Sequence, residues 1–143
     1  MARSTANTAC AFCEIIAGRA DAAVVYGDAC CVAFLDTRPL FHGHVLLCPR
    51  EHVATLDALP TALIQPLFTA AQRLSRAVKV AMEAQGTFVA MNNRVSQSVP
   101  HLHIHIVPRS RGDGLRGFFW PRTKYDSPDQ MHAVAQRIRA ALP

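Results

Sequence analysis

Five short stretches of the chain combine apolar runs with turn residues at their ends, which is typical of β-strands. Gly27 and Asp28 separate the first two stretches and predict a hairpin, while Pro49 ends the third. The stretches are residues 23–28, 30–37, 43–49, 87–93 and 101–108.

Two longer segments carry apolar residues at helical spacing. In residues 61–85 the apolar positions recur every three or four residues; Pro66 lies within them, so the regular helix can start there instead of at Thr61. Residues 128–141 predict a C-terminal helix, with Ser127 as its N-cap and Pro128 at its first position. A short helix over residues 12–18 would end at Gly18.

The order of strands, helix, strands and helix predicts an α+β fold. We expect a five-stranded, mainly antiparallel sheet with two main helices on one face. The chain has 143 residues, enough for one domain with a substantial core. We assign residues 10–143, including the C-terminal helix, to a single domain and residues 1–9 to a flexible tail.

Composition and charge narrow the class of protein. Half of the residues are hydrophobic and 17% are charged, which indicates a globular and not a disordered chain. No apolar run approaches the roughly 18 residues that span a membrane, and the first ten residues lack a secretory signal. The net charge of +5 is spread out, without a lysine-rich arm, so it favours a small anionic ligand over nucleic acid.

The five cysteines do not indicate a disulfide framework, because their number is odd and no export signal is present. We therefore expect reduced thiols in a cytoplasmic protein. Cys30, Cys31 and Cys48 are interpreted as small buried or half-buried hydrophobes.

The stretch VPHLHIHIVPR, residues 99–109, places histidines at 101, 103 and 105. On a strand, alternate side chains share one face and stand about 6.6 Å apart. Three imidazoles on the outer face could present a nucleophile, bind metal or be plain surface residues, although a straight row converges poorly on one ion. The polar loop before it, residues 92–100, is an ordinary turn or a phosphate cradle.

Three motifs in order resemble the histidine triad (HIT) family of nucleotide hydrolases and transferases. They are CAFCEIIAG (10–18), VAFLDTRPLFHGHVLLCPREH (32–52) and QSVPHLHIHIVPR (97–109), and GDGLRGFFW (112–120) is similar to the tail of bacterial members. The resemblance implies a homodimer with a continuous sheet. It also implies an enzyme that forms a nucleotidyl-histidine intermediate on a purine nucleotide.

Residue roles follow from this resemblance by position. His103 would attack the α-phosphorus and His105 would contact phosphate or the leaving group, with donors from Gln97, Ser98 and Asn92. Asp36 matches the carboxylate that binds the ribose, and the residues that match the wall around the base are Phe12, Ile15 and Phe34. The phosphate loop is shorter than usual, and Arg94 and Ser96 stand where the family has glycines.

Some bacterial members hold zinc through a Cys-x-x-Cys pair and two histidines. The matching positions are Cys10, Cys13, His52 and His101, so the resemblance implies a structural zinc ion. The pair could instead be redox-active or simply buried, and His52 could hydrogen-bond to His101 without metal. For His44 and Trp120 no role is assigned.

The leading hypothesis is a hydrolase of nucleoside 5′-phosphoramidates or dinucleoside polyphosphates that releases a nucleoside monophosphate. Two alternatives stay open: a nucleotide-binding regulatory protein with little turnover, and a zinc or redox module built on the cysteine pair.

Overall fold

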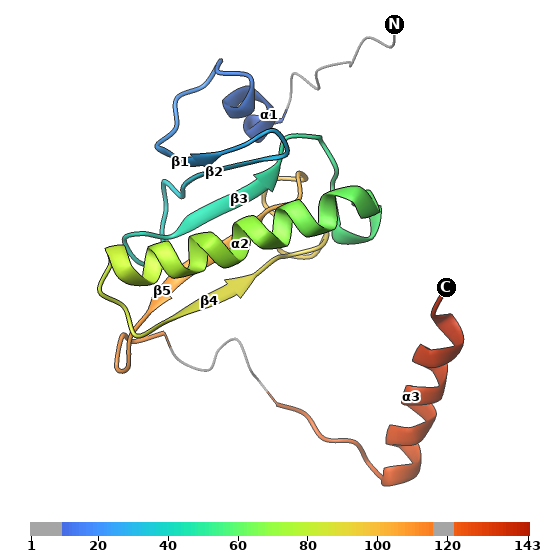
Figure 1. Ribbon diagram of the computed structural model, residues 1–143. Helices are drawn as coiled ribbons and strands as arrows, with labels where there is room; N and C mark the ends of the chain where they lie inside the picture. Colours follow the sequence, from blue (N-terminus) through green and yellow to red (C-terminus); the bar gives the residue numbers. More distant parts are fainter. Residues whose placement is uncertain (1–9, 116–121) are drawn as a thin grey trace, which may run out of the picture. The chain divides into compact units, whose positions relative to one another are not determined.

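Five antiparallel strands form one sheet in the order β1-β2-β3-β5-β4 (Figure 1). The computed structural model describes residues 10–115 and 122–143. Each neighbouring pair is antiparallel, which confirms the predicted α+β fold and five-stranded sheet. The strands are β1 Val24–Gly27, β2 Cys31–Leu35, β3 Val45–Pro49, β4 Gly86–Ala90 and β5 Ile104–Arg109.

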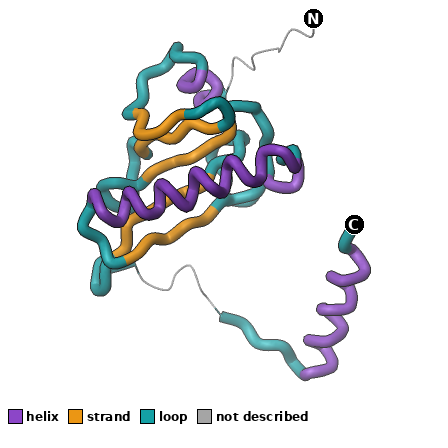
Figure 2. Tube along the Cα trace, in the orientation of Figure 1, coloured by secondary structure: helices purple, strands orange, loops and turns teal. Residues whose placement is uncertain are grey.

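Three α-helices and one short 3₁₀ turn accompany the sheet (Figure 2). They are α1 Ala11–Ile16, η1 Leu56–Ala58, α2 Thr61–Ala81 and α3 Pro128–Ala141. Helix α3 begins as predicted, because the Ser127 side chain accepts a hydrogen bond from the Gln130 amide.

Helix α2 begins at Thr61, so the expectation that Pro66 could start it was wrong. A proline inside a helix removes one backbone hydrogen bond. Here the lost bond lies near the start of a 21-residue helix, whose following turns are anchored by the packing of Leu67, Leu74 and Val78 into the core.

The two faces of the sheet are covered by different helices. Helix α2 packs on the face that carries Leu47, Ile104 and Ile106. On the other face Phe12 of α1 joins a second cluster with Cys10, Val32, Phe34, Leu46 and Cys48. That the two main helices share one face stays a prediction, because α3 belongs to a separate unit of the chain. Strands β2 and β3 are buried on both faces, so apolar alternation could not show which face a helix covers.

The described residues divide into two compact units, and the boundary along the chain lies between Asp113 and Gly114. The first contains the sheet, α1 and α2, and the second contains α3. That residues 10–143 form one domain stays a prediction, and the assigned tail 1–9 and Trp120 lie outside the described residues. Among the described residues, no helix is both long enough and apolar enough to cross a membrane.

A tight turn before β3 depends on Gly43. Its φ is +90°, a conformation that residues with a Cβ rarely adopt. A Cβ at this position would also stand 2.5 Å from Met82 Cγ, at the end of α2. The turn sets the direction of the next residue, His44, which is buried.

We expect Gly43→Ala to lower the free energy of unfolding by about 2 kcal/mol or more, from backbone strain and the contact with Met82. Gly18→Ala is the matched control, because Gly18 has a φ of +74° and open space around it. It should lose only about 1 kcal/mol from strain. Urea unfolding measures both, and equal losses would contradict a role for the Met82 contact.

Candidate active site

The three histidines of the sequence row do not share a strand. Only His105 lies in β5, and His101 and His103 precede it. The chain leaves the sheet there because the Leu102 amide donates to the Val53 carbonyl at 2.7 Å. His101 and His103 are 0% and 3% exposed, so the expectation of a solvent-facing row was wrong.

A main-chain hydrogen bond orients His103. Its Nδ1 lies 2.7 Å from the carbonyl oxygen of His101. A carbonyl can only accept, so Nδ1 carries the proton and the lone pair of the neutral ring is on Nε2. The Phe12 ring packs edge-on against this imidazole, with centroids 5.0 Å apart. His103 is thus held in the tautomer that a nucleophile requires.

His44, to which the sequence assigned no role, fixes the tautomer of His105. The Leu40 amide donates to His44 Nδ1 at 3.1 Å, so the proton of neutral His44 is on Nε2. That nitrogen lies 2.9 Å from His105 Nδ1 and donates to it. His105 therefore carries its own proton on Nε2. Sequence alone could not find this chain, because it joins residues 61 positions apart.

Burial keeps both rings of this pair neutral. It lowers the pKa of His105 to about 4, helped by the nearby His103 and His44. Burial also lowers the pKa of His44, although the Asp36 carboxylate opposes the shift. The Asp36 oxygen stands 3.8 Å from His44 Nε2. Near neutral pH, His105 thus offers a hydrogen-bond donor without a positive charge.

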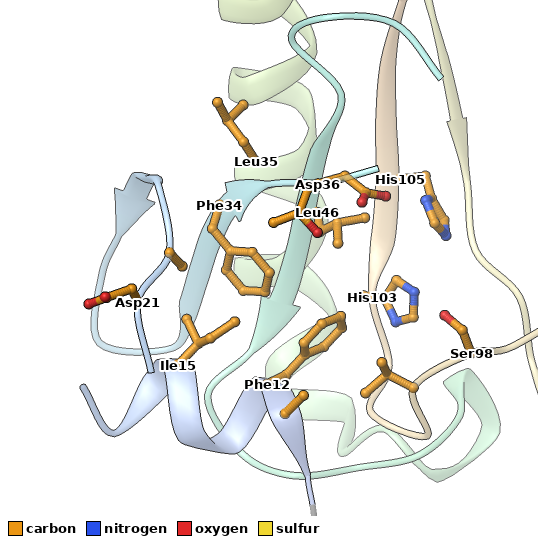
Figure 3. Close-up of a pocket in the computed structure, with 14 residues that line it drawn as sticks. Phe12, Ile15, Asp21, Phe34, Leu35, Asp36, Leu46, Ser98, His103 and His105 are labelled. Atoms are coloured by element: carbon orange, nitrogen blue, oxygen red, sulfur yellow. The ribbon is translucent and has the colours of Figure 1, made fainter. Parts of the chain in front are cut away.

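Seven of the predicted residues line one pocket of about 280 Å³ (Figure 3). Among these seven, the polar members are Asp36, His103, His105 and Ser98, and the apolar members are Phe12, Ile15 and Phe34. Ser98 lies beside His103, and Ile15 and Phe34 lie farther from the histidine (Figure 3). The pocket therefore has a polar end suited to phosphate and an apolar end suited to a flat ring.

Sequence reasoning missed other residues of this pocket, namely Ala11, Asp21, Ala22, Leu35, Thr37, Leu46 and Val99. Leu46 could have been found from strand periodicity, because it pairs with Phe34 across β2 and β3 and so shares its face. The others lie in loops or beside predicted residues, where periodicity carries no signal.

Two predicted phosphate donors, Asn92 and Gln97, do not line the pocket. Gln97 Nε2 donates to the Ala54 carbonyl at 2.7 Å, and its Oε1 accepts from the Arg94 amide at 3.0 Å. Asn92 Nδ2 donates to the Ser96 carbonyl at 3.2 Å. In this structure both amides hold the loop, so their contact with phosphate stays a prediction.

In the loop before the histidines, residues 92–100, two residues other than glycine have a backbone conformation that is typical of glycine. Arg94 and Ser96 have φ values of 70° and 59°. Such angles cost a residue with a Cβ about 1–2 kcal/mol, which the hydrogen bonds of Asn92 and Gln97 offset. At the two positions where the resemblance implies glycines, this chain thus has a left-handed backbone without glycine.

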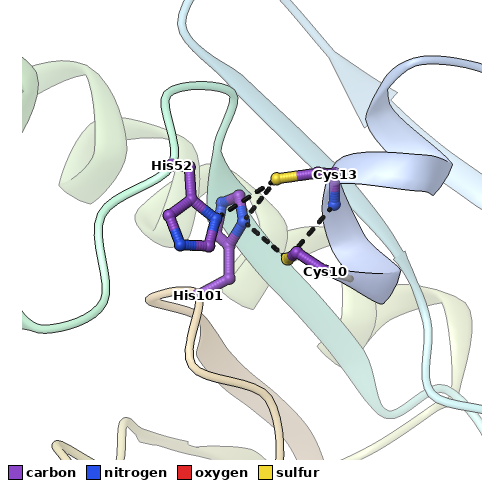
Figure 4. A group of neighbouring side chains, drawn as sticks. All are labelled: Cys10, Cys13, His52 and His101. Atoms are coloured by element: carbon purple, nitrogen blue, oxygen red, sulfur yellow. Dashed lines mark hydrogen bonds between the residues drawn. The ribbon is translucent and has the colours of Figure 1, made fainter. Parts of the chain in front are cut away.

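The four predicted zinc ligands come together at the start of α1 (Figure 4). Cys10 Sγ and Cys13 Sγ each lie 3.6 Å from His101 Nδ1, and Cys13 Sγ lies 3.2 Å from His52 Nδ1. Tetrahedral zinc, with bonds of about 2.3 Å to sulfur and 2.0–2.1 Å to nitrogen, places such ligands about 3.6 Å apart. The residues therefore fit a zinc ion, and we name Cys10, Cys13, His52 and His101 the zinc clip.

The protonation of His101 also suits a metal. Its Nε2 donates to the Pro49 carbonyl at 2.8 Å, so Nδ1 keeps a lone pair that faces both thiols. Without a cation, burial and then Cys10 raise the pKa of the Cys13 thiol to about 11. A divalent cation would favour the thiolate instead.

A second group, Asp36, His44 and His105, also has the composition of a metal site. Its hydrogen bonds argue against that use. The Nε2 of His44 faces His105 but carries a proton, since Nδ1 accepts from the Leu40 amide. A protonated nitrogen has no lone pair for a metal. This group is a hydrogen-bond relay, and the zinc clip is the site that fits an ion.

The other three cysteines behave as hydrophobes. Cys31 and Cys48 are 1% and 0% exposed, and burial raises their pKa values to about 11 and about 12. Cys30 is half-buried and packs against the core. All five cysteines have free thiols, as predicted.

The fold, the pocket and the histidine arrangement define an α+β protein of the histidine triad class. The HIT domain family model matches residues 17–112, and the chain belongs to this family.

Several relatives align with this chain over most of both lengths. An uncharacterised HIT-like protein of Mycobacterium tuberculosis is 37% identical over 93% of this chain and 92% of its own. The crystal structure of a HIT family protein from Bacillus subtilis superposes with a TM-score of 0.86 at 32% identity, covering 94% and 98% of the two chains. A zinc-bound histidine triad protein of Mycobacterium smegmatis has a TM-score of 0.71 at 32% identity, covering 92% and 97%.

Two relatives carry names of enzymes. An adenosine 5′-monophosphoramidase of Candida albicans is 29% identical over 88% of each chain. An adenylylsulfatase of Arabidopsis thaliana is 35% identical over 78% of this chain and 58% of its own. Nucleotide hydrolase activity is thus supported at the level of the family.

The lowered pKa of His105 makes stability depend on pH. Between about pH 6.5 and about pH 4 the unfolded chain protonates this imidazole and the native chain does not. The unfolded state then binds more protons, so stability rises with pH across this window and falls on acidification. In urea unfolding at different pH values, we expect the free energy of unfolding of His105→Gln to fall less on acidification than that of the native chain. Exposed His132→Gln should keep the full fall, and identical pH profiles for the two variants would contradict the assignment.

Proposed function

We propose that the protein is a nucleotidyl hydrolase that cleaves a nucleoside 5′-phosphoramidate or a dinucleoside polyphosphate at the α-phosphate. The observation that carries this proposal is His103, whose unprotonated Nε2 stands in a pocket with a polar and an apolar end. The family membership and the two relatives named as hydrolases support the same chemistry.

The proposed reaction has two steps. In the first, the Nε2 lone pair of His103 forms a bond to the α-phosphorus, and the bond from phosphorus to the leaving group breaks. A leaving amine takes up one proton from solvent, whereas a leaving phosphate departs as its anion. In the second step, water forms a bond to phosphorus, gives one proton to solvent and breaks the N–P bond, which releases the nucleoside monophosphate and restores His103 with its proton on Nδ1. Covalent catalysis thus divides one difficult substitution into two easier ones.

Neutral hydrogen-bond donors stabilise the charge on the phosphorus oxygens. His105 Nε2–H, oriented by the relay from His44, donates to a phosphate oxygen or the leaving group. Ser98 donates from the side of the pocket near His103. Gln97 and Asn92 act by holding this loop and would need to reorient in order to donate themselves.

The nucleoside occupies the rest of the pocket. The base, a purine by our prediction, packs against Phe12, Ile15 and Phe34. Asp36 accepts from the ribose hydroxyls through the oxygen that does not bind the Arg38 amide. The net charge of +5 favours an anionic substrate.

The zinc clip would hold one structural zinc ion. All four of its ligands come from the protein, and a closed site of this kind stabilises a fold without activating water. The clip ties α1 to His101, whose carbonyl orients His103.

A homodimer and a cytoplasmic location stay predictions from the resemblance and the sequence. Strand β4 is an edge of the sheet and leaves Val89 45% exposed, which is compatible with pairing to a second copy.

We expect His103→Ala to abolish release of AMP from an adenosine 5′-phosphoramidate. The other histidine of the pocket, His105, cannot replace it, because its unprotonated Nδ1 already accepts a hydrogen bond from His44. Chromatography of AMP measures turnover, and intact mass spectrometry looks for the adenylyl adduct on the native chain. His132→Ala, an exposed change on α3, is the control and should keep full activity.

Undiminished turnover by His103→Ala would remove the covalent mechanism. The alternative, a regulatory protein that binds nucleotide with little turnover, is favoured by one observation: Asn92 and Gln97 are engaged in the loop. Tight AMP binding by the native chain, with no product over hours from any substrate of a panel, would support that alternative.

We expect one zinc ion per purified chain by elemental analysis. Cys13→Ser should lose most of the metal, because it removes a thiolate near both histidines of the clip. Cys30→Ser is the matched control and should keep the metal, since Cys30 packs against the core away from the clip. Equal zinc content in the two variants would contradict the assignment of the clip.

A further inference from the structure

Helix α1 belongs to the zinc clip and to the nucleotide pocket at once. Cys10 caps the helix and Cys13 lies in its first turn, so both thiol ligands are held by this one segment. Between them Ala11 and Phe12 line the pocket, and Ile15 follows one turn later. Helix α1 and its N-cap Cys10 thus carry half of the metal site and much of the wall around the base.

This helix is too short to be stable by itself. Isolated helices shorter than about 12–15 residues are marginal in water, and α1 has six residues. Its position relative to the sheet therefore depends on its side chains. Phe12 is 7% exposed and packs on Phe34, with ring centroids 5.2 Å apart, while the thiols reach His52 and His101.

A second connection runs through His101. Its Nδ1 faces both thiols of the clip, its Nε2 is held by the Pro49 carbonyl, and its own carbonyl binds His103. Phe12 closes the path, because its ring contacts both imidazoles, with centroids 6.0 Å from His101 and 5.0 Å from His103. An ion that fixes the clip therefore fixes two sides of the pocket.

We propose that zinc in the clip and nucleotide in the pocket bind cooperatively, with α1 as the shared element and Phe12 as the positioning residue. This inference rests on the proposed function and adds regulation to it. Each ligand orders helix α1, which the other ligand also contacts. Whichever ligand binds second therefore meets a helix that is already ordered. By linkage, the factor by which nucleotide strengthens zinc binding equals the factor by which zinc strengthens nucleotide binding.

The test is the zinc affinity of the full-length, zinc-loaded protein, measured by competition with a chromophoric chelator with and without saturating AMP. We expect AMP to tighten zinc binding about tenfold, within the usual range of coupling between sites. Calorimetry of AMP binding to zinc-loaded and zinc-free protein should give the same factor.

Two variants separate coupling from affinity. Phe12→Leu should keep one zinc per chain. The factor by which AMP tightens zinc binding should fall toward one, because the leucine loses the ring contacts with His101 and His103. Asp36 lies outside α1, so Asp36→Asn should need a higher AMP concentration for saturation. At saturation, AMP should still tighten zinc binding by the full factor. If instead Phe12→Leu kept the full factor and Asp36→Asn reduced it, the role of Phe12 would be overturned.

The outcomes are distinguishable. If AMP binds the zinc-loaded protein but leaves zinc affinity unchanged, the coupling is overturned and the proposed function stands. If calorimetry finds no AMP binding at all, the proposed function fails and the coupling with it. If the protein does not retain zinc against a weak chelator, the clip is not a zinc site and the coupling is overturned.

Discussion

The hydrogen bond from His103 Nδ1 to the carbonyl of His101 is the interaction on which the site depends. It selects the ring nitrogen that faces the pocket, and without it the imidazole could present a protonated nitrogen to phosphorus. Other parts of the structure serve to place this carbonyl. The Leu102 amide, bound to Val53, takes the chain out of the sheet, and the buried His101 ring is held between the two thiols of the zinc clip and the Pro49 carbonyl.

The two histidine clusters show that hydrogen-bond polarity, more than composition, decides what a group of ligands can do. His101 and His44 are both buried and lie near other possible ligands. His101 donates through Nε2 to a carbonyl and keeps a lone pair toward two thiols. His44 accepts from a backbone amide and so donates toward His105. The first arrangement fits a metal, and the second relays a fixed orientation to a phosphate donor.

Sequence predicted much of the fold because periodicity and turn chemistry act locally. The strands, the Ser127 cap and the apolar character of Cys31 and Cys48 follow from neighbouring residues. The burial of His103 did not follow, since the period-2 pattern continues through residues whose backbone has left the sheet. The relay from His44 and the loop role of Gln97 depend on partners 61 and 43 positions away, which no local pattern reveals. The motif resemblance located the pocket, but it could not show which amides the loop itself uses.

The stereochemistry at phosphorus tests the central claim, covalent catalysis by His103, most directly. The substrate is an adenosine 5′-phosphoramidate made chiral at phosphorus with sulfur and hydrolysed in ¹⁸O-water. Two in-line displacements, first by His103 Nε2 and then by water, each invert the phosphorus, so the account predicts overall retention of configuration. Overall inversion would show a single displacement by water and would contradict the nucleotidyl-histidine intermediate.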